Sequence, residues 1–219
     1  MVKNQKSVFW KAGILTLIIF LLGILFGAFI ESTRTTQIKE NYESLEFQLL
    51  DSKLKTDFYQ LIDKDFCEFA IEDNLKFSNM IYEEGKKIEI YDQFNKLNKE
   101  ALKREKKKYA FLKVEFWMNS LILKEKCNTD YVHLLYFYED DPSLSIVKQE
   151  QKAQSDILIK LKEKYGASLI LIPLPTNLDI SIISGLIEIN NIQKTPTLLL
   201  EENLKLEGIH SIEEIESFL

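Results

Sequence analysis

A block of nineteen residues near the N-terminus carries no charge and no proline. Residues 12–30 read AGILTLIIFLLGILFGAFI. As a helix, this block is about 30 Å long, which matches the hydrocarbon thickness of a bilayer. A cleaved signal peptide is the alternative, but its apolar region usually has about 7–15 residues and precedes a small-residue cleavage site. Phe29-Ile30-Glu31 offers no such site. The pattern therefore favours an uncleaved transmembrane anchor.

The charges on the two sides of this segment predict its orientation. Three lysines and no acidic residue precede it, whereas acidic and basic residues nearly cancel just after it. The positive-inside rule then places residues 1–11 in the cytoplasm and the rest of the chain outside. The whole chain has a formal net charge of −6, and the exterior part is more acidic still. This balance argues against binding of nucleic acid or anionic lipid through bulk charge.

Small residues lie on one face of the apolar segment, at Gly23, Gly27 and Ala28. Such a face lets two helices approach closely and could support a homodimer. Small residues are also common in membrane helices that do not associate, and both interpretations stay open.

Residues 32–127 have a helical composition, with no proline and the single glycine Gly85. Apolar residues recur at helical spacing in residues 35–64, 66–84 and 95–126, with breaks expected near 63–65 and within 85–93. We expect two or three antiparallel helices that form a stalk or collar between the membrane and a terminal domain. A long parallel coiled coil is disfavoured, because the heptad phase is not held beyond about two repeats. The basic run at 103–108 contains Glu105 and indicates a solvated helix face.

The chain contains two cysteines, Cys67 and Cys127. An even number in an exported segment favours a disulfide. Buried free thiols and a redox-active pair are the alternatives, and acidic neighbours would raise the pKa of either thiol and so disfavour an active pair. The two histidines, His133 and His210, do not complete a zinc site with these cysteines at the spacings present. We therefore expect no metal and no cofactor.

Residues 131–219 alternate between strand-like and helix-like runs. Strands are predicted at 131–138, 168–173, 197–200 and 204–208, with helices between them and at the end of the chain. A strand–helix–strand unit of this length implies a parallel pair with a right-handed connection. Glu201-Glu202-Asn203 predicts a hairpin turn, and Ser211 with Glu214 predicts a capping box for the last helix.

The start and end of the first helix in this region are also predicted. Asp141 or Ser143 can cap it, and Pro142 suits its first turn. It should run to about Tyr165, where Gly166 can end it.

The order strand–helix–strand–helix–strand–strand–helix, with Thr195-Pro196-Thr197 before the third strand, resembles the thioredoxin family. The resemblance covers residues 131–219. It implies an α/β fold with a four-stranded mixed sheet and flanking helices, and a cis peptide bond before Pro196. It also implies that Thr195 and Pro196 face the segment after the first strand and form a groove for extended protein segments. Residue by residue, that groove segment is Asp141, Pro142, Ser143 and Leu144.

Thioredoxins carry Cys-x-x-Cys in this segment, and this chain does not. Asp141 and Leu144 stand where the two cysteines would fall. A carboxylate and an isobutyl group cannot exchange disulfides. The fold is therefore expected and its redox chemistry is not.

Three functions from different classes follow. We expect a membrane-anchored, extracytoplasmic, redox-inactive thioredoxin-like module that binds a protein or an extended peptide. A structural envelope component that assembles through its helical region is the first alternative. A thiol–disulfide oxidoreductase using Cys67 and Cys127 is the second. The sequence does not identify the partner.

Overall fold

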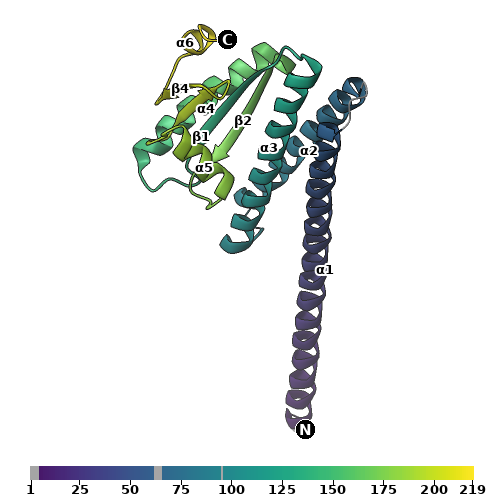
Figure 1. Cartoon of the computed structure of the whole chain (residues 1–219). Coiled ribbons are helices and arrows are strands. Elements are labelled where there is room, and N and C mark those ends of the chain that lie inside the picture. Colours follow the sequence, from purple (N-terminus) through teal and green to yellow (C-terminus); the bar gives the residue numbers. More distant parts are fainter. Residues whose placement is uncertain (1–4, 62–65, 95) are drawn as a thin grey trace. The chain divides into compact units, whose positions relative to one another are not determined.

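The computed structural model describes residues 5–61, 66–94 and 96–219. The chain divides into two compact units, Met1–Leu50 and Asp51–Leu219. Figure 1 shows the elements along the chain. In order they are α1 (Gln5–Leu61), α2 (Cys67–Gln93), α3 (Lys99–Cys127), β1 (Val132–Tyr138), α4 (Ser145–Tyr165), η1 (Gly166–Ser168), β2 (Leu169–Pro175), α5 (Ser181–Ile189), β3 (Thr197–Leu200), β4 (Leu204–Glu207) and α6 (Ile212–Glu216).

Helix α1 contains the apolar segment found in the sequence. Phe9–Ile30 is long and apolar enough to cross a membrane, with a mean hydropathy of 2.8, and a signal sequence would have the same character. The helix continues without interruption to Leu61. Open space surrounds Gly23 and Gly27 in the single chain, so pairing through them stays a prediction. The break expected near residues 63–65 lies outside the described residues.

The four strands form one mixed sheet in the order β2-β1-β3-β4. The parallel pair predicted from the strand–helix–strand unit is β1 with β2, where Val132 lies opposite Leu169. Strand β3 runs antiparallel to β1 and joins β4 in an antiparallel hairpin. Strands β2 and β4 are therefore the two edges of the sheet.

Helices cover both faces of this sheet, and alternate residues of β1 point to the two sides. Leu135 and Phe137 pack with α3 and α5, whereas Leu134 and Tyr136 pack with α4 and α6. This alternation follows from the two-residue period of a strand. The result is a layer of helices on each side of a buried sheet, as Figure 1 shows.

Helix α3 differs from its expected place in a stalk separate from residues 131–219. Ala110, Val114 and Trp117 pack directly against the sheet, and α3 belongs to the same compact unit. Near its C-terminus, Leu123 and Cys127 instead pack with the start of α2. Helix α3 therefore has apolar side chains with two packing partners, the sheet and the start of α2.

The break predicted within residues 85–93 is wrong, because α2 continues through Gly85 to Gln93. A Cβ atom at Gly85 would lie 2.7 Å from the hydroxyl of Tyr109 in α3. The glycine therefore lets two helices approach and does not end one. Helix α3 starts four residues later than predicted, where the side chain of Asn98 accepts a hydrogen bond of 2.8 Å from the amide of Ala101.

The last turns of α1, from Asp51 to Leu61, belong to the second unit and pack on α2 and α3. Tyr59 is buried and stacks on Phe66, with ring centroids 5.2 Å apart. Lys55 pairs with Asp73 of α2 at 3.0 Å. Asn119 of α3 donates to the hydroxyl of Ser52 at 3.0 Å. The end of α1, α2 and α3 thus form three packed helical segments, and α3 packs on the sheet.

Two of the shorter predictions agree with the structure. Ser211 and Glu214 form the predicted capping box of α6. Helix α4 ends at Tyr165, followed by Gly166 with a φ of +54°. Helix α5 begins at Ser181, and Leu178 and Ile180 just before it are buried in the core.

Removing two methyl groups at Val114 tests whether α3 is part of the sheet domain. Val114 is 4% exposed against the sheet, so Val114→Ala should lower the free energy of unfolding by about 2 kcal/mol. The measurement is denaturant unfolding of the full chain in detergent, followed by Trp117 fluorescence in a Trp10→Phe background. Phe111→Ala on the same helix is the control, because Phe111 is 42% exposed. Equal effects of the two substitutions would contradict this packing.

Candidate functional site

A cavity of about 690 Å³ opens where α3 begins and where the loops after β1 and β2 meet. Because β1 and β2 are parallel, their carboxyl ends lie at the same edge of the sheet, where ligands of α/β proteins commonly bind. The lining combines lysines and aspartates with a few apolar residues. It consists of Tyr91, Asp92, Leu97, Lys99, Leu102, Lys103, Lys106, Asp140, Asp141, Pro142, Lys148, Asn177 and Leu178. We call this cavity the charged cleft.

Two interactions hold the wall of the charged cleft. Asn177 accepts a hydrogen bond from the amide of Asp140 and donates one to its carbonyl, both 2.8 Å long. This reciprocal pair ties the loop after β1 to the loop after β2. The ammonium group of Lys106 lies 2.9 Å from carboxylate oxygens of both Asp140 and Asp92. Burial lowers the pKa of Lys106, but the hydrogen bonds to the two aspartates outweigh burial and raise it above its ordinary value.

The predicted groove segment lies only partly in the charged cleft. Asp141 and Pro142 line it, whereas the side chains of Ser143 and Leu144 are exposed, Leu144 by 63%. The predicted start of the helix is wrong. Helix α4 begins at Ser145, and Leu144 occupies the cap position without a side-chain hydrogen bond.

The backbone explains why residues 141–144 stay outside α4. Asp141 has a φ of +50°, a left-handed conformation that does not belong in a right-handed helix. Leu144 is extended, with φ −90° and ψ 123°. Asp141, Pro142 and Ser143 therefore form a loop of their own and do not cap α4.

The Thr195–Pro196 peptide bond is cis, as the resemblance implies. Thr195 donates a hydrogen bond of 3.0 Å to Glu139, just before the predicted groove segment. Pro196 is buried, and its carbonyl accepts from the amide of Gly208 at 2.8 Å. In the described loops and turns, neither the backbone amide nor the backbone carbonyl of Thr195 forms a hydrogen bond with another backbone group. Thr195 therefore lies next to Glu139. Among the described residues, it forms no hydrogen bond with a residue that lines the charged cleft.

A buried lysine lies near this end of the sheet. Lys113 of α3 is 3% exposed, and its ammonium group lies 4.5 Å from the ring centre of Tyr109 and 5.8 Å from that of Tyr138. Burial lowers the pKa of Lys113 to about 7, with Asp140 pulling weakly in the other direction. Burial also raises the pKa of the Tyr138 hydroxyl well above its ordinary value. Lys113, Tyr109 and Tyr138 thus place polar groups within the packing between α3 and β1.

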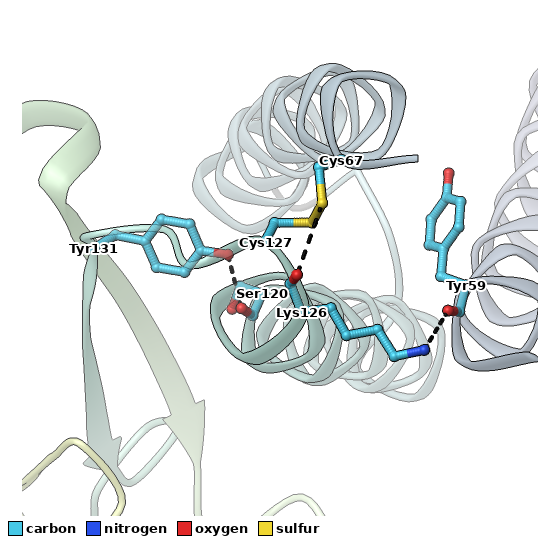
Figure 2. Close-up of a disulfide and its surroundings, with 6 residues drawn as sticks. All are labelled: Tyr59, Cys67, Ser120, Lys126, Cys127 and Tyr131. Carbon is cyan, nitrogen blue, oxygen red and sulfur yellow. Dashed lines mark hydrogen bonds between the residues drawn. A yellow bond between two sulfur atoms is a disulfide. The ribbon is translucent and has the colours of Figure 1, made fainter. Parts of the chain in front are cut away.

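Cys67 and Cys127 lie away from the charged cleft, at the start of α2 and the end of α3 (Figure 2). Their Cα atoms are 5.5 Å apart and their sulfur atoms are bonded. Lys126, beside Cys127, donates to the carbonyls of Tyr59 and Gln60 at 2.8 and 3.0 Å. A cation at the C-terminal end of α1 also suits the negative end of the helix dipole. This region holds three helix ends together.

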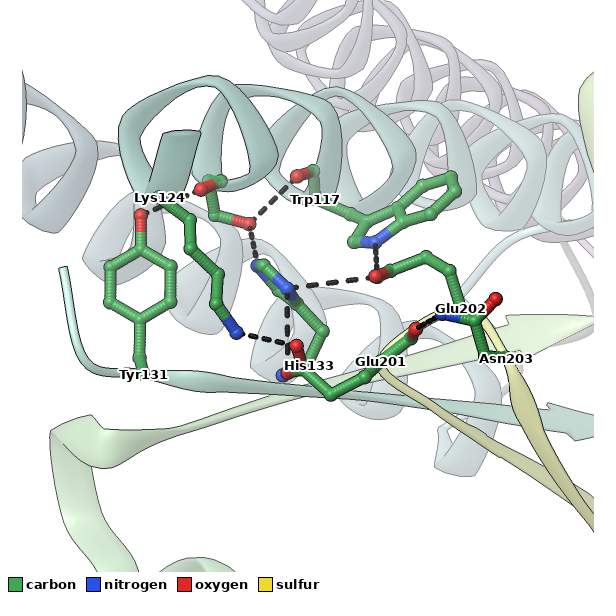
Figure 3. A network of polar contacts seen from close by, with 8 residues as sticks. Trp117, Lys124, Tyr131, His133, Glu201, Glu202 and Asn203 are labelled. Carbon is green, nitrogen blue, oxygen red and sulfur yellow. Dashed lines mark hydrogen bonds and ion pairs between the residues drawn. The ribbon is translucent and has the colours of Figure 1, made fainter. Parts of the chain in front are cut away.

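A second polar cluster was not found from the sequence. Its centre is His133 of β1, which is 0% exposed (Figure 3). Burial lowers the pKa of His133 to about 4; Glu201 opposes this effect and Lys124 adds to it. Around the ring lie side chains of α3 and of the β3–β4 turn, namely Trp117, Ser120, Lys124, Glu201 and Glu202. We call this set the His133 cluster.

One signal in the sequence could have indicated the His133 cluster. Glu201 and Glu202 have φ values of +45° and +58° in the three-residue turn between β3 and β4, and asparagine and glycine adopt such positive φ values more readily than glutamate does. Two glutamates at such positions suggest that their side chains have a role elsewhere. Their partners on α3 and β1 are too distant in sequence to be inferred from local pattern.

The disulfide remains to be tested in the native protein. Alkylation of the purified full chain without reductant should leave both cysteines unmodified, and digestion should give one linked peptide pair by mass spectrometry. Replacing both cysteines by serine should reduce the free energy of unfolding by about 4 kcal/mol, since the bridge closes a long loop. Quantitative alkylation of Cys67 and Cys127 under these conditions would contradict the pairing.

The stability of the second unit should depend on pH through Lys113. Its folded pKa is lowered to about 7 from 10.5, so between these values the unfolded chain binds a proton that the folded chain does not. The free energy of unfolding should therefore rise from pH 7.5 to 9.5, below the range in which tyrosines titrate. Lys113→Met should flatten this rise, whereas Lys160→Met, at an exposed position of α4, should not. An unchanged slope in Lys113→Met, measured by Trp117 fluorescence, would exclude this role.

No protein-family model matches the chain. No curated protein matches it either. Among solved structures, a malarial protein has 20% identity and a TM-score of 0.32, over 40% of this chain and 91% of its own. Chloroplastic thioredoxin z has 12% identity and a TM-score of 0.32, over 45% and 84%. The germline-specific thioredoxin Deadhead of Drosophila melanogaster has 17% identity and a TM-score of 0.31, over 46% and 88%. These solved structures are thus similar to less than half of the chain.

Proposed function

We propose that the chain is a membrane-anchored, extracytoplasmic protein whose thioredoxin-like domain binds an extended segment of a partner protein without redox chemistry. The observation that carries this proposal is the charged cleft. It lies at the carboxyl ends of the parallel strands, it is lined by Asp141 and Pro142 of the predicted groove segment, and no cysteine belongs to its lining.

The arrangement of the strands supports the thioredoxin-like part of the proposal. A parallel β1–β2 pair, an antiparallel β3 beside β1 and a terminal β3–β4 hairpin agree with the order that the resemblance implies. The cis peptide bond before Pro196 stands at the position expected for the groove loop. The apolar character of Phe9–Ile30 and the lysines that precede residue 12 support the anchor and its orientation.

The positions of the cysteines argue against an oxidoreductase. Disulfide exchange needs an accessible thiolate. Cys67 and Cys127 are bonded to each other between α2 and α3, and the loop from Asp141 to Leu144 has no thiol. The positive end of a helix dipole would lower the pKa of a nearby thiol. The N-terminus of α4, however, lies at Ser145, after this loop.

The lining of the charged cleft indicates what kind of segment it would bind. Lys106 is already paired with Asp92 and Asp140, whereas Lys99 and Lys148 are exposed at the rim. Carboxylates of a partner would pair with these lysines, and its backbone could use the amide and carbonyl of Thr195. Addition to a sheet edge is a poorer route, because Pro173 and Pro175 remove donors from β2.

A specific observation also favours the second candidate, a structural component that assembles through its helices. Leu54, Phe58 and Leu61 lie at helical spacing near the end of α1 and are 60%, 55% and 83% exposed. An exposed apolar stripe of this kind suits packing against another helix.

Site-specific photo-crosslinking in the membranes of the organism that makes the protein can separate these functions. A photoreactive residue at Asp141 should capture a single partner protein, and Lys148→Glu should reduce the yield at least about fivefold by removing a rim charge. The same residue at Lys160, on the exposed side of α4, is the control and should capture nothing comparable. Capture from position 58 alone would replace the cleft proposal with helical assembly.

The absence of redox chemistry is tested separately with the purified full chain. Reduction of insulin by the chain should stay at the rate of the uncatalysed control. Activity above that rate, lost in Cys67→Ser, would overturn the proposal and support the oxidoreductase.

A further inference from the structure

The imidazole of His133 has one ring nitrogen without a hydrogen-bond partner. The side chain is fully buried in β1, and no partner for Nδ1 exists within the described part of the chain. Buried polar atoms of side chains are nearly always hydrogen-bonded, and each exception calls for an explanation.

The other ring nitrogen indicates which tautomer is present. Nε2 lies 2.8 Å from the hydroxyl of Ser120. That hydroxyl has one proton, which it donates to the carbonyl of Trp117 at 2.7 Å. Toward the ring the hydroxyl must therefore accept, so Nε2 carries the proton. In the neutral ring, Nδ1 then presents a lone pair.

Two carboxylates face this lone pair. The Oε1 atom of Glu202 lies 3.6 Å from Nδ1, and the Oε1 atom of Glu201 lies 4.0 Å from it. The three atoms lie within 4.8 Å of one another. These three acceptor atoms cannot form hydrogen bonds with one another and therefore repel, and a cation among them would turn this repulsion into attraction (Figure 3).

Each of these three groups is held in place from outside. Ser120 orients the imidazole. Glu201 accepts from the backbone amide of His133 at 2.7 Å and pairs with Lys124. Glu202 accepts from the indole nitrogen of Trp117 at 3.0 Å. Such outer hydrogen bonds are typical of metal sites, where they fix the direction of each ligand.

We infer that His133, Glu201 and Glu202 bind a divalent transition metal of the Zn²⁺ class. One imidazole nitrogen and two carboxylate oxygens form a ligand set that zinc accepts, and a fourth position stays open. A nitrogen ligand disfavours Mg²⁺ and Ca²⁺, which prefer oxygen. The two carboxylates and Lys124 leave one net negative charge beside a neutral ring, which favours a cation.

The ion has a route to the site and an effect on the fold. Glu201 and Glu202 are 40% and 31% exposed, so solvent reaches the carboxylates although the imidazole is buried. A bound ion would fasten the β3–β4 turn to β1. Because Trp117 donates to Glu202, binding should also change the environment of this indole on α3.

Zinc titration of the full chain in detergent, stripped with a chelator and then freed of it, tests the inference. The chain has two tryptophans, so in a Trp10→Phe background Trp117 is the only one and reports on the site. Zn²⁺ should bind with one equivalent per chain and change the Trp117 fluorescence, whereas Mg²⁺ at the same concentration should not. Equilibrium dialysis gives the stoichiometry independently.

Matched variants locate the ion. Glu202→Gln keeps an oxygen that can accept from Trp117 but loses the charge, and it should weaken zinc binding at least about tenfold, as should Glu201→Gln. Glu207→Gln in β4 and His210→Gln should leave the affinity within twofold. Thermal unfolding of each variant verifies that it is folded.

Two results would overturn the inference. One is the absence of saturable zinc binding to the unaltered chain up to 1 mM Zn²⁺ (about the weak limit for a specific site), whatever the variants do. The other is an affinity that Glu201→Gln and Glu202→Gln leave unchanged, or that His210→Gln alone abolishes. Neither result bears on the charged cleft, which shares no residue with this cluster.

Discussion

The contact between α3 and the sheet organises residues 51–219. Ala110, Val114 and Trp117 bury one side of this helix on β1 and β2, while Leu123 packs against α2 and the end of α1. A helix that is buried on two sides connects the two layers that it touches, because separating it from either layer would expose apolar surface to water. The disulfide at Cys127 adds a covalent tie at the same end.

The polar features of the second unit also depend on this helix. Residues about two helical turns apart on α3 serve the three polar features: Lys106 lines the charged cleft, Lys113 lies beside Tyr138, and Ser120 belongs to the His133 cluster. A displacement of α3 relative to the sheet would therefore disturb all three together. The charged cleft and the His133 cluster lie at different positions along one helix, and this arrangement gives the helix a part in both proposed activities.

Local patterns in the sequence predicted much of the fold. Strand β1 has the β-branched and aromatic residues that are typical of a buried strand, and the turn residues between Leu200 and Leu204 indicated the hairpin. The cis bond before Pro196 came from the resemblance and agrees with the structure. These features depend on a few neighbouring residues, so a sequence window contains the information that determines them.

Contacts between distant segments were not predictable in the same way. The hydrogen bond from the amide of His133 to Glu201 joins residues 68 apart in the sequence, and no local pattern identifies the two residues as partners. Gly85 was interpreted as a helix break, because its close contact with Tyr109 depends on how α2 and α3 pack. The start of α4 was misplaced because the pairing of Asn177 with Asp140 holds the preceding loop away from the helix.

The edges of the sheet have a consequence under the membrane anchoring proposed above. Copies anchored in that way would share a plane, where confinement raises their effective concentration, and exposed strand edges on such copies would tend to pair and aggregate. Strand β2 carries Pro173 and Pro175 on the same side of its backbone, two residues apart, and β4 is only four residues long with Lys205 and Glu207. Both edges thus resist pairing with a neighbour, so the domain can be crowded at a surface without forming a continuous sheet.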